Sequence, residues 1–487
     1  MSDLKTKTIS ALIWSSTDKA GVYLLQFVMG IVLARLLEPA DFGLVGMLTI
    51  FLVLIQIFTD GGLSAALIQK KEPTNEEFST IFYFNVLSAA LGAGILFLCA
   101  PLVAGFYNEP LLDPLTKVLS LNLVFGSFGL VQSTRMTKRL DFRTQTKITL
   151  IATASSGFFA IMAALHGFGV WSLVIRELSG NVVRTTLFWM SSDWRPSPAF
   201  SIRRLREMLG FGSRLLASSL LFRLVDQADL VVIGKAFSAQ DLGFYTRAGS
   251  LARVAPSGFS VVVNRVTFPV FSTIQDEPRR LKNGLKKILR VLALINLPAM
   301  TGLFVVALPT VELLLTPKWT PCVPYVRLLC LVGLLHPLHV INLPVLLAMG
   351  RSDLYLRLAI IKAVLTLSNA AVAWRFGIEA LIWGQVALSI VCYYVNSYYT
   401  GILIGYSFLE QVRDLFPYLL GAVAMAVVIY PVKWLVPNNN LALLACQTVF
   451  GGLIYIGICR VFKLAGYMEV RGMLRSRMSA VTMARIS

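Results

Sequence analysis

One stretch of this sequence occurs twice, about 200 residues apart, and both copies join one apolar segment to the next. The first copy runs from Leu33 to Leu44 and the second from Ile233 to Phe244. Aligned, they pair Arg35 with Lys235, Asp41 with Asp241 and Gly43 with Gly243. A membrane protein built from two similar halves is most often a transporter, because two lobes can rock around a site between them. A duplicated scaffold without transport is the alternative.

Composition indicates that the apolar segments lie in a membrane. The chain has 487 residues, of which 56% are hydrophobic and only 14% charged, whereas a soluble domain carries about 25% charged residues. The apolar residues occur in runs of about 20, the length that crosses a bilayer as a helix. The short alternating segments of a membrane β-barrel do not occur in the sequence. We therefore predict an all-α polytopic membrane protein.

Hydropathy and length predict fourteen membrane-spanning helices. Their approximate cores are residues 11–34, 42–66, 80–105, 112–133, 147–165, 169–190, 210–234, 242–270, 286–308, 323–348, 354–374, 378–401, 412–432 and 440–462. The duplication divides them into an N-terminal lobe, 1–190 with spans 1–6, and a C-terminal lobe, 209–401 with spans 7–12. Residues 191–208 then form a cytoplasmic linker, 402–462 an added helix pair, and 463–487 a basic cytoplasmic tail.

The net charge of +19 comes mainly from connections between the apolar segments. Basic residues concentrate in alternate connections and in both ends of the chain, and they are few in the remaining connections. By the positive-inside rule we place the basic side and both termini in the cytoplasm. The aromatic residues lie in the apolar segments rather than among the basic ones, which argues against a nucleic-acid partner.

Patterns for catalysis or metal binding do not occur in the sequence. There is no G-x-x-x-x-G-K phosphate loop, so we expect no ATPase. The six cysteines are scattered, without metal-ligand or redox spacing. Two of the three histidines, His336 and His339, are one helical turn apart, but two ligands are too few for a metal site, and we expect packing or polar contacts instead. We predict no catalytic residue, no metal site and no cofactor.

Charged residues inside the predicted spans are the main candidates for function, because each costs about 2.5–3.5 kcal/mol at the centre of a membrane helix on insertion scales. The first two spans of each predicted lobe hold Asp18, Lys19, Asp60, Arg223, Asp226, Asp229, Arg247, Arg253 and Arg265; span 6 adds Arg176 and Glu177, and span 11 adds Lys362. We interpret spans 1, 2, 7 and 8 as the lining of a polar cavity between the lobes. The alternative is that neighbouring charges only neutralise one another, as at Asp18–Lys19, Arg176–Glu177 and Arg223–Asp226.

The arginines of span 8 favour an anionic ligand. Arg247, Arg253 and Arg265 have no acidic residue in the same predicted helix, and guanidinium groups bind phosphate in a bidentate manner. We predict substrate contacts from these three together with Arg223 and Lys19. The candidates for ion coupling are the acidic residues Asp18, Asp60, Asp226 and Asp229, because a carboxylate in such a cavity could carry a proton.

The motifs around the duplicated stretch resemble those of a known family. They are segments 34–43 (ARLLEPADFG), 139–143 (RLDFR), 226–235 (DQADLVVIGK), 241–245 (DLGFY) and 268–272 (FPVFS). On these motifs the chain resembles the polysaccharide-transport branch of the multidrug/oligosaccharidyl-lipid/polysaccharide exporter (MOP) superfamily. Within that branch it is most similar to Wzx-type O-antigen flippases and to the colanic-acid exporter group.

The resemblance implies fourteen helices in two pseudo-symmetric lobes around a cavity that opens alternately to each side. It implies a cargo of undecaprenyl-diphosphate-linked oligosaccharide, flipped from the cytoplasmic to the periplasmic leaflet of the bacterial inner membrane. Spans 13 and 14 would hold the lipid tail among the membrane lipids. A polysaccharide polymerase and a chain-length regulator are candidate partners. Without an ATPase, transport would draw on an H⁺ or Na⁺ gradient or on the membrane potential.

Two other functions are alternatives. An ion-coupled exporter of small amphipathic compounds would be expected to have an acid-rich cavity, unlike the arginine-rich span 8. A membrane-embedded enzyme that polymerises or ligates glycans would be expected to carry a large periplasmic loop. The outward connections are short, the longest covering about residues 308–323, and a transporter is therefore favoured over an enzyme.

We expect Arg253→Ala and Arg265→Ala each to reduce export while the protein stays in the membrane, because each variant loses a cation that has no acidic partner in its own helix. The measurement is the amount of exported polysaccharide beside the amount of protein in isolated membranes. If both variants export normally, the role assigned to these arginines is wrong.

Overall fold

A computed structural model describes residues 21–254, 267, 271–435 and 439–472 of the chain. Over these residues the chain is helical, with turns and short loops between the helices and no strand. Within the same residues, ten helices are long and apolar enough to cross a membrane. The predicted fold class, an all-α membrane protein with many spans, is therefore confirmed.

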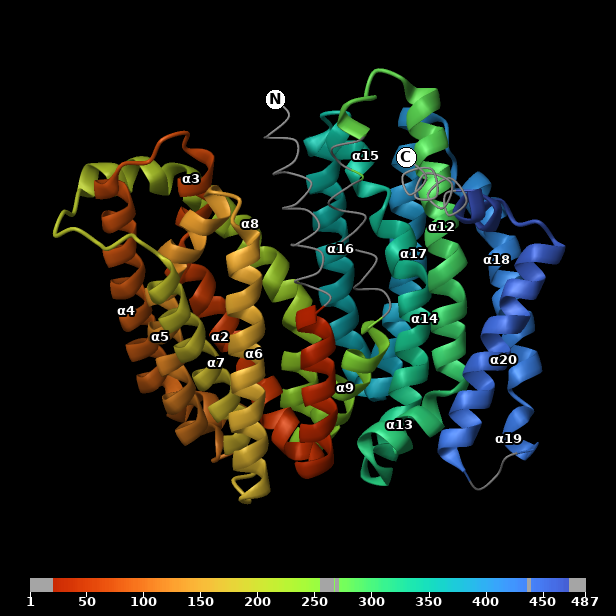
Figure 1. The fold of residues 1–487 in the computed structure, drawn as a ribbon, viewed down its shortest axis with the longest axis horizontal. Helices are drawn as coiled ribbons and strands as arrows, with labels where there is room; N and C mark the ends of the chain where they lie inside the picture. Colours follow the sequence, from red (N-terminus) through yellow and green to blue (C-terminus); the bar gives the residue numbers. More distant parts are fainter. Residues whose placement is uncertain (1–20, 255–266, 268–270, 436–438, 473–487) are drawn as a thin grey trace, which may run out of the picture. The chain divides into compact units, whose positions relative to one another are not determined.

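The chain forms two compact units, Met1–Thr246 and Arg247–Ser487. The helices of unit 1 are Gly21–Leu36, α2 (Pro39–Asp60), α3 (Leu63–Gln69), α4 (Asn75–Tyr107), α5 (Leu112–Lys138), α6 (Phe142–Leu165), α7 (Trp171–Ser191), α8 (Ile202–Ala236) and the start of α9 (Ala239–Ala252). Within unit 1, Figure 1 shows the long helices running alongside one another, with the short helix α3 at one end. The predicted lobes, linker and tail stay predictions.

Unit 2 continues the same architecture with long helices and short connecting ones (Figure 1). Its helices are α12 (Pro278–Val305), α13 (Ala307–Leu315), η2 (Pro317–Cys322), α14 (Val323–Val340), α15 (Leu343–Ala348), α16 (Ser352–Ala373), η3 (Trp374–Phe376), α17 (Ile378–Ile404), α18 (Phe408–Ile429), α19 (Val432–Leu435) and α20 (Asn440–Val461). Helices α13 and α19 lie at the opposite end of unit 2 from α15 in Figure 1.

Ten of the fourteen predicted spans coincide with these long apolar helices. The other four fall on Gly21–Leu36, α7, α8 and α9. Helices α7 and α8 have 21 and 35 residues, long enough to cross a bilayer, but each carries several charges, which lower its hydropathy. The count of fourteen spans stays a prediction.

The two copies of the duplicated stretch begin their helices in the same way. Asp41 Oδ2 accepts the backbone N–H of Glu38 at 2.9 Å, and Asp241 Oδ2 accepts the backbone N–H of Ser238 at 3.3 Å. Each carboxylate satisfies a donor that has no partner within its helix, and each lies near the positive end of the helix dipole. The repeated aspartate therefore marks the start of α2 and of α9.

The two copies also contact each other, through the repeated glycine. A Cβ atom on Gly43 would lie 1.7 Å from the carbonyl oxygen of Ala239, the first residue of α9. A Cβ atom on Gly243 would lie 1.8 Å from the carbonyl oxygen of Pro39, the first residue of α2. The contact is thus reciprocal, and only glycine leaves room for it because the obstacle on each side is backbone.

The connection between α7 and α8 packs against other helices of unit 1. The backbone N–H of Ser197 donates to Ser79 Oγ of α4 at 3.0 Å. The guanidinium of Arg135 lies 5.1 Å from the ring centroid of Phe78 and 5.6 Å from that of Trp194. These cation–π contacts and the hydrogen bond fasten the connection to α4 and α5.

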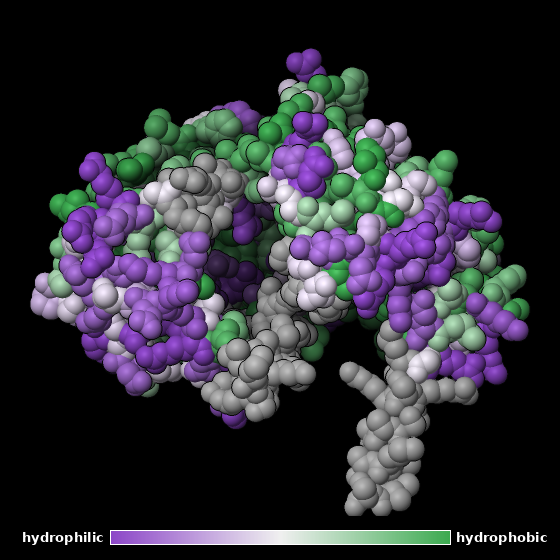
Figure 2. All heavy atoms as spheres, turned by 90° about the horizontal axis from the view of Figure 1, so that it is seen from above, coloured by the Kyte–Doolittle hydropathy of each residue, from purple (hydrophilic) through white to green (hydrophobic). Residues whose placement is uncertain are grey.

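Charged side chains collect at the helix ends, where an apolar span leaves the hydrocarbon. Unit 1 exposes Lys71, Glu72, Glu76, Arg203, Arg206 and Glu207 next to α3 and the start of α8. The start of α12 in unit 2 exposes Arg279, Arg280 and Lys287. In Figure 2, the end of unit 1 that carries α3 is largely hydrophilic.

We expect Gly43→Ala to destabilise the protein by about 1–3 kcal/mol, because the new methyl group pushes the start of α2 away from the backbone of α9. Thermal unfolding of the purified protein measures the effect. The matched control is Gly105→Ala in α4, where a Cβ would meet open space and alanine raises helix propensity by about 1 kcal/mol. Equal melting temperatures for the two variants would refute the contact.

Candidate functional site

A polar cavity lies inside unit 1, among helices that are otherwise apolar. Its volume is about 260 Å³, near the lower end of the range for small-molecule sites. It is enclosed by the helix Gly21–Leu36 and by α2, α5, α6 and α7. Its polar lining consists of Gln26, Gln56, Thr59, Asn122, Ser127, Thr153, Ser156, Arg176, Glu177, Asn181 and Arg184.

All the charge in the cavity comes from one face of α7. Arg176, Glu177, Asn181 and Arg184 lie on that face because four-residue steps return to the same side of a helix. Gly180 lies between them, and a Cβ there would be only 3.2 Å from Ser156 Cβ of α6. This glycine allows α6 and α7 to pack closely beside the charged residues.

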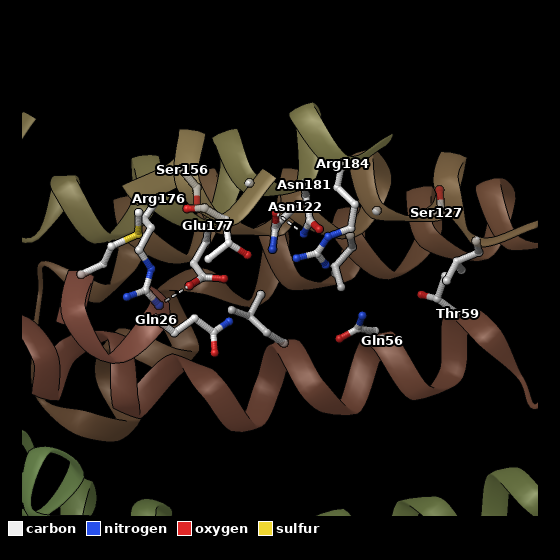
Figure 3. A pocket seen from close by; sticks show the side chains of 17 residues that line it. Gln26, Gln56, Thr59, Asn122, Ser127, Ser156, Arg176, Glu177, Asn181 and Arg184 are labelled. Atoms are coloured by element: carbon white, nitrogen blue, oxygen red, sulfur yellow. Dashed lines mark hydrogen bonds and ion pairs between the residues drawn. The ribbon is translucent and has the colours of Figure 1, made fainter. Parts of the chain in front are cut away.

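Two hydrogen-bonded pairs order the wall formed by α5 and α7. Arg176 Nη2 donates to Glu177 Oε1 at 2.8 Å, and Asn181 Nδ2 donates to Asn122 Oδ1 at 2.7 Å. Figure 3 shows both pairs, with the neutral side chains Gln26, Gln56 and Thr59 across the cavity from them. The charged wall therefore faces a wall of amides and a hydroxyl.

Arg184 differs from the other polar residues of the cavity. Its buried Nε atom has no hydrogen-bond partner within the residues that the structure describes. In Figure 3 its guanidinium lies beside the pair Asn122–Asn181. A buried donor without an acceptor costs about 1–3 kcal/mol, so a ligand that accepts from Arg184 would recover that energy.

The chemistry of the cavity favours an anionic or hydroxyl-rich ligand. Two guanidinium groups and one carboxylate give the lining a net charge of +1 (2 − 1). Guanidinium groups bind carboxylate and phosphate, and amides exchange hydrogen bonds with hydroxyl groups. A cationic ligand would be repelled, and repulsion is stronger here than in water because the surroundings are of low dielectric constant.

Those predicted site residues that the structure describes do not line this cavity. Asp60 ends α2, and its Oδ1 accepts from the backbone N–H and the hydroxyl of Ser64, which holds the start of α3. On α8, Arg223 and Asp226 are exposed and Asp229 is half-buried. Asp226 Oδ2 accepts from Gln227 Nε2 at 3.0 Å.

The predicted residues of span 8 are only partly described. Arg247 is half-buried and Arg253 is exposed, and Arg253 Nε donates to the carbonyl of Gly249 in its own helix at 3.2 Å. Asp18, Lys19 and Arg265 lie outside the described residues. The roles assigned to these residues and to Arg223, Asp60, Asp226 and Asp229 stay predictions.

Sequence reasoning missed Arg184 and the amides around it. It noted Arg176 and Glu177 as a self-neutralising pair, and the structure shows that pair. Arg176, Gly180 and Arg184 are four residues apart, and this spacing could have indicated that both arginines lie on the same face of the helix. Nothing in the spacing indicated that Asn122 of α5 would meet this face.

Two apolar grooves lie in unit 2. One, of about 530 Å³, lies between α12, α18 and α20 and includes Pro298, Gly302, Gly451 and Tyr455. Another, of about 670 Å³, lies between α12, α14 and α18. Their linings are almost entirely apolar, which suits a hydrocarbon chain.

Ion pairs hold the starts of two groove helices together. Lys282 and Lys286 of α12 bind Glu410 of α18 at 2.6 and 3.2 Å, and Arg290 binds Asp414 at 2.7 Å. Lys286 also lies 3.0 Å from Asp414. A network of this kind fixes the relative register of α12 and α18 better than isolated surface pairs do.

A metal centre finds no support in the part of the chain that the structure describes. There, no group of three or more His, Cys, Asp or Glu side chains is placed to hold an ion.

Comparison with known sequences links the chain to polysaccharide synthesis. The family model described as "Polysaccharide biosynthesis protein" matches residues 32–324. The "Lipopolysaccharide biosynthesis protein WzxC" of Escherichia coli K12 is 32% identical over 370 residues, which are 74% of each chain. The "Succinoglycan biosynthesis transport protein ExoT" of Rhizobium meliloti 1021 is 26% identical over 97% of each chain. These matches confirm the resemblance that the motifs indicated.

Comparison with solved structures shows a shared fold. The "Lipid II flippase MurJ, inward closed conformation" has a TM-score of 0.76 at 13% identity, over 92% of this chain and 98% of that one. An inward-facing "multidrug resistance MATE family transporter of the MOP superfamily" has a TM-score of 0.64 at 15% identity, over 80% and 95%. The fold is therefore that of MOP superfamily transporters.

We expect Arg184→Met to leave the melting temperature unchanged or raise it, because methionine replaces a charge whose Nε is unsatisfied and such replacements are often stabilising by about 1 kcal/mol or more. We expect Glu177→Gln to lower it, since the cavity then holds two guanidinium groups and no carboxylate. Thermal unfolding of the purified variants measures both. A strong loss of stability in Arg184→Met would show that the guanidinium is satisfied.

Proposed function

This chain belongs to the polysaccharide biosynthesis protein family, and on that premise we propose that it is a lipid-linked oligosaccharide flippase. It moves undecaprenyl-diphosphate-linked repeat units of a lipopolysaccharide or exopolysaccharide from the cytoplasmic to the periplasmic leaflet of the inner membrane. It does so by alternating access, as a membrane transporter rather than as an enzyme.

The observation that carries this proposal is the polar cavity of unit 1. A sugar headgroup cannot cross about 30 Å of hydrocarbon unaided, and it needs hydrogen-bonding groups along its path. The cavity supplies amides, hydroxyls and two guanidinium groups within helices that are otherwise apolar. Its net positive charge suits the negative charge of a diphosphate-linked cargo.

The grooves of unit 2 supply the apolar counterpart. A polyprenyl tail stays in hydrocarbon throughout transport, so it needs an apolar surface rather than a closed path. The groove between α12, α18 and α20 has such a lining. Helices α18 and α20 are the pair that the sequence places after the two lobes, and the tail would lie along them.

Orientation and energy source follow from charge. By the positive-inside rule, the basic connections before α8 and α12 favour a cytoplasmic location for those connections and for both termini. Two negative charges moving outward across an inside-negative membrane gain about 2.3 kcal/mol per charge per 100 mV. The membrane potential, or an H⁺ or Na⁺ gradient, would therefore drive transport without a cofactor. A polysaccharide polymerase and a chain-length regulator would receive the cargo.

The alternative of a drug exporter has less support. Small amphipathic drugs are mostly cationic, and the cavity of unit 1 repels cations because its lining carries one more positive than negative charge.

We expect deletion of the gene to abolish the surface polysaccharide and to accumulate lipid-linked repeat units on the cytoplasmic side, because synthesis continues while translocation stops. Extraction and chromatography of the polyprenyl-linked lipids measure the accumulation. Expression of the intact protein restores export, and expression of the Gly105→Ala variant, in which the added Cβ meets open space, serves as a matched control for dosage. Normal polysaccharide in the deletion strain, or drug sensitivity with no glycan defect, would refute the proposal.

A further inference from the structure

One of the two apolar grooves of unit 2 is confined to half of the membrane. This short groove, of about 670 Å³, lies between α12, α14 and α18. Its lining on α18 begins at Leu419 and continues to Tyr430 and Pro431. The stretch from Leu419 to Tyr430 spans about 16 Å as a helix, roughly half of the ~30 Å hydrocarbon core. The short groove therefore has the depth of a single leaflet.

The short groove lies toward the end of unit 2 that carries α13 and α19, opposite α15 (Figure 1). Its lining residues on α12 fall in the last turns of that helix, which ends at Val305. On α18 the lining continues past the helix end at Ile429. The ion pairs between α12 and α18 are at the starts of the two helices. The groove is therefore in the half of the membrane farther from these basic helix starts.

A cation and two aromatic rings mark this end of the short groove. Lys433 Nζ donates at 2.7 Å to the hydroxyl of Tyr430, which lines the groove. The same ammonium lies 3.9 Å from the ring centroid of Tyr430 and 5.1 Å from that of Trp434. Tyrosine and tryptophan are enriched where a membrane helix meets the lipid headgroups. The ammonium of Lys433 is therefore held at headgroup depth, beside the end of the groove.

A second cation continues the groove-lining face of α14. Arg327 lies three and four residues before Cys330 and Leu331, which line the short groove. Residues at these spacings are neighbours on one face of a helix. Arg327 is half-buried, and it is near enough for its charge to act on the phenol of Tyr430. Two cations thus lie at the same end of one apolar groove.

These two cations have no acidic partner in the part of the chain that the structure describes. There, no carboxylate forms an ion pair with Lys433 or with Arg327. The connection that follows Lys433, residues 436–439, contains no acidic residue in its sequence. The hydroxyl of Tyr430 accepts from Lys433, which leaves its own hydrogen free to donate. This end of the groove therefore offers positive charge and a hydrogen-bond donor to an anion.

We propose that the short groove binds an anionic phospholipid. One acyl chain lies between α12, α14 and α18, where the apolar lining contacts it along the depth of a leaflet. The phosphate lies at the end of the groove, where Lys433, Arg327 and the hydroxyl of Tyr430 donate to its oxygens. This site goes beyond the proposed function, because binding of a membrane lipid here does not require that the protein moves a cargo.

A phospholipid fits the short groove better than a polyprenyl tail does. An acyl chain reaches the middle of the bilayer, which matches the depth of this groove. The other apolar groove, between α12, α18 and α20, includes Val306 at one end and Tyr467 at the other. Tyr467 lies beyond the end of α20 at Val461, so that groove extends through most of the membrane. A long tail is therefore better accommodated there, and the short groove is left to a shorter chain.

The test is native mass spectrometry of the purified full-length protein, titrated in detergent with phosphatidylglycerol or with zwitterionic phosphatidylcholine. We expect wild type to bind phosphatidylglycerol several-fold more tightly, because only this headgroup carries a net negative charge. Lys433→Gln should weaken phosphatidylglycerol binding about fivefold, the contribution of one cation near an anionic lipid surface. Arg327→Gln should have a similar effect. Both variants should bind phosphatidylcholine as wild type does, which shows that they are folded.

Matched controls test the headgroup contacts and the groove separately. Arg375→Gln removes another exposed cation of unit 2, one that lies 5.9 Å from the ring centroid of Trp374 and outside the groove. It should bind both lipids as wild type does. Ala426→Phe places a ring in the groove, whereas Ala424→Phe places the same ring on an exposed face of α18 outside it. Only Ala426→Phe should reduce the binding of both lipids.

Four results would overturn the proposal. The first is equal affinity of wild type for the two lipids, and the second is equal affinity in Ala426→Phe and Ala424→Phe. The third is tighter binding of undecaprenyl phosphate than of phosphatidylglycerol, lost in Ala426→Phe, which would assign the groove to the tail of the cargo. The fourth is a dimer that Ala426→Phe dissociates, which would show that a second copy covers the groove. Polysaccharide export, measured in cells, tests the flippase function independently of these titrations.

Discussion

Polar groups inside hydrocarbon must bind a partner or water, and this constraint decides where function can reside in this protein. In unit 1 it gathers the polar face of α7 around a cavity in which Glu177 is the one carboxylate for two guanidinium groups. In unit 2 it places Asn396 Nδ2 of α17 against the carbonyl oxygen of His339, just before the break between α14 and α15. The cavity of unit 1 carries excess positive charge, which suits a cargo with an anionic headgroup.

The duplicated stretch serves the fold in two ways. Its aspartate begins a helix in each copy, and its glycine, two residues later, lets the two helix starts meet backbone to backbone. Two similar segments can form such a contact because each offers the other the same surface, as in a two-fold symmetric interface. The repeat is therefore explained by local hydrogen bonding and by a tertiary contact, and neither requires a ligand.

Most of the fold could be predicted from the chain alone, since hydrophobic runs of sufficient length become membrane helices whatever surrounds them. The candidate site could be predicted only in part. Asp60 was predicted to couple ions because it is a charged residue in a predicted span. Its carboxylate accepts hydrogen bonds from the backbone N–H and the hydroxyl of Ser64 at the start of α3. Arg184 was overlooked, although it continues the polar face that begins at Arg176. Residue type and spacing show which groups share a helix face, not which neighbouring helix meets that face.

By itself, the sequence determined the membrane environment, the helical class, the repeated helix starts and the family, because these depend on composition and local order along the chain. Only the tertiary structure decided which charges find partners. Asn122 and Asn181 are 59 residues apart yet share a hydrogen bond, and Lys282 pairs with Glu410, which follows it by 128 residues. Such pairings depend on how helices pack against one another, and electrostatic energy depends on distance and burial rather than on position in the chain.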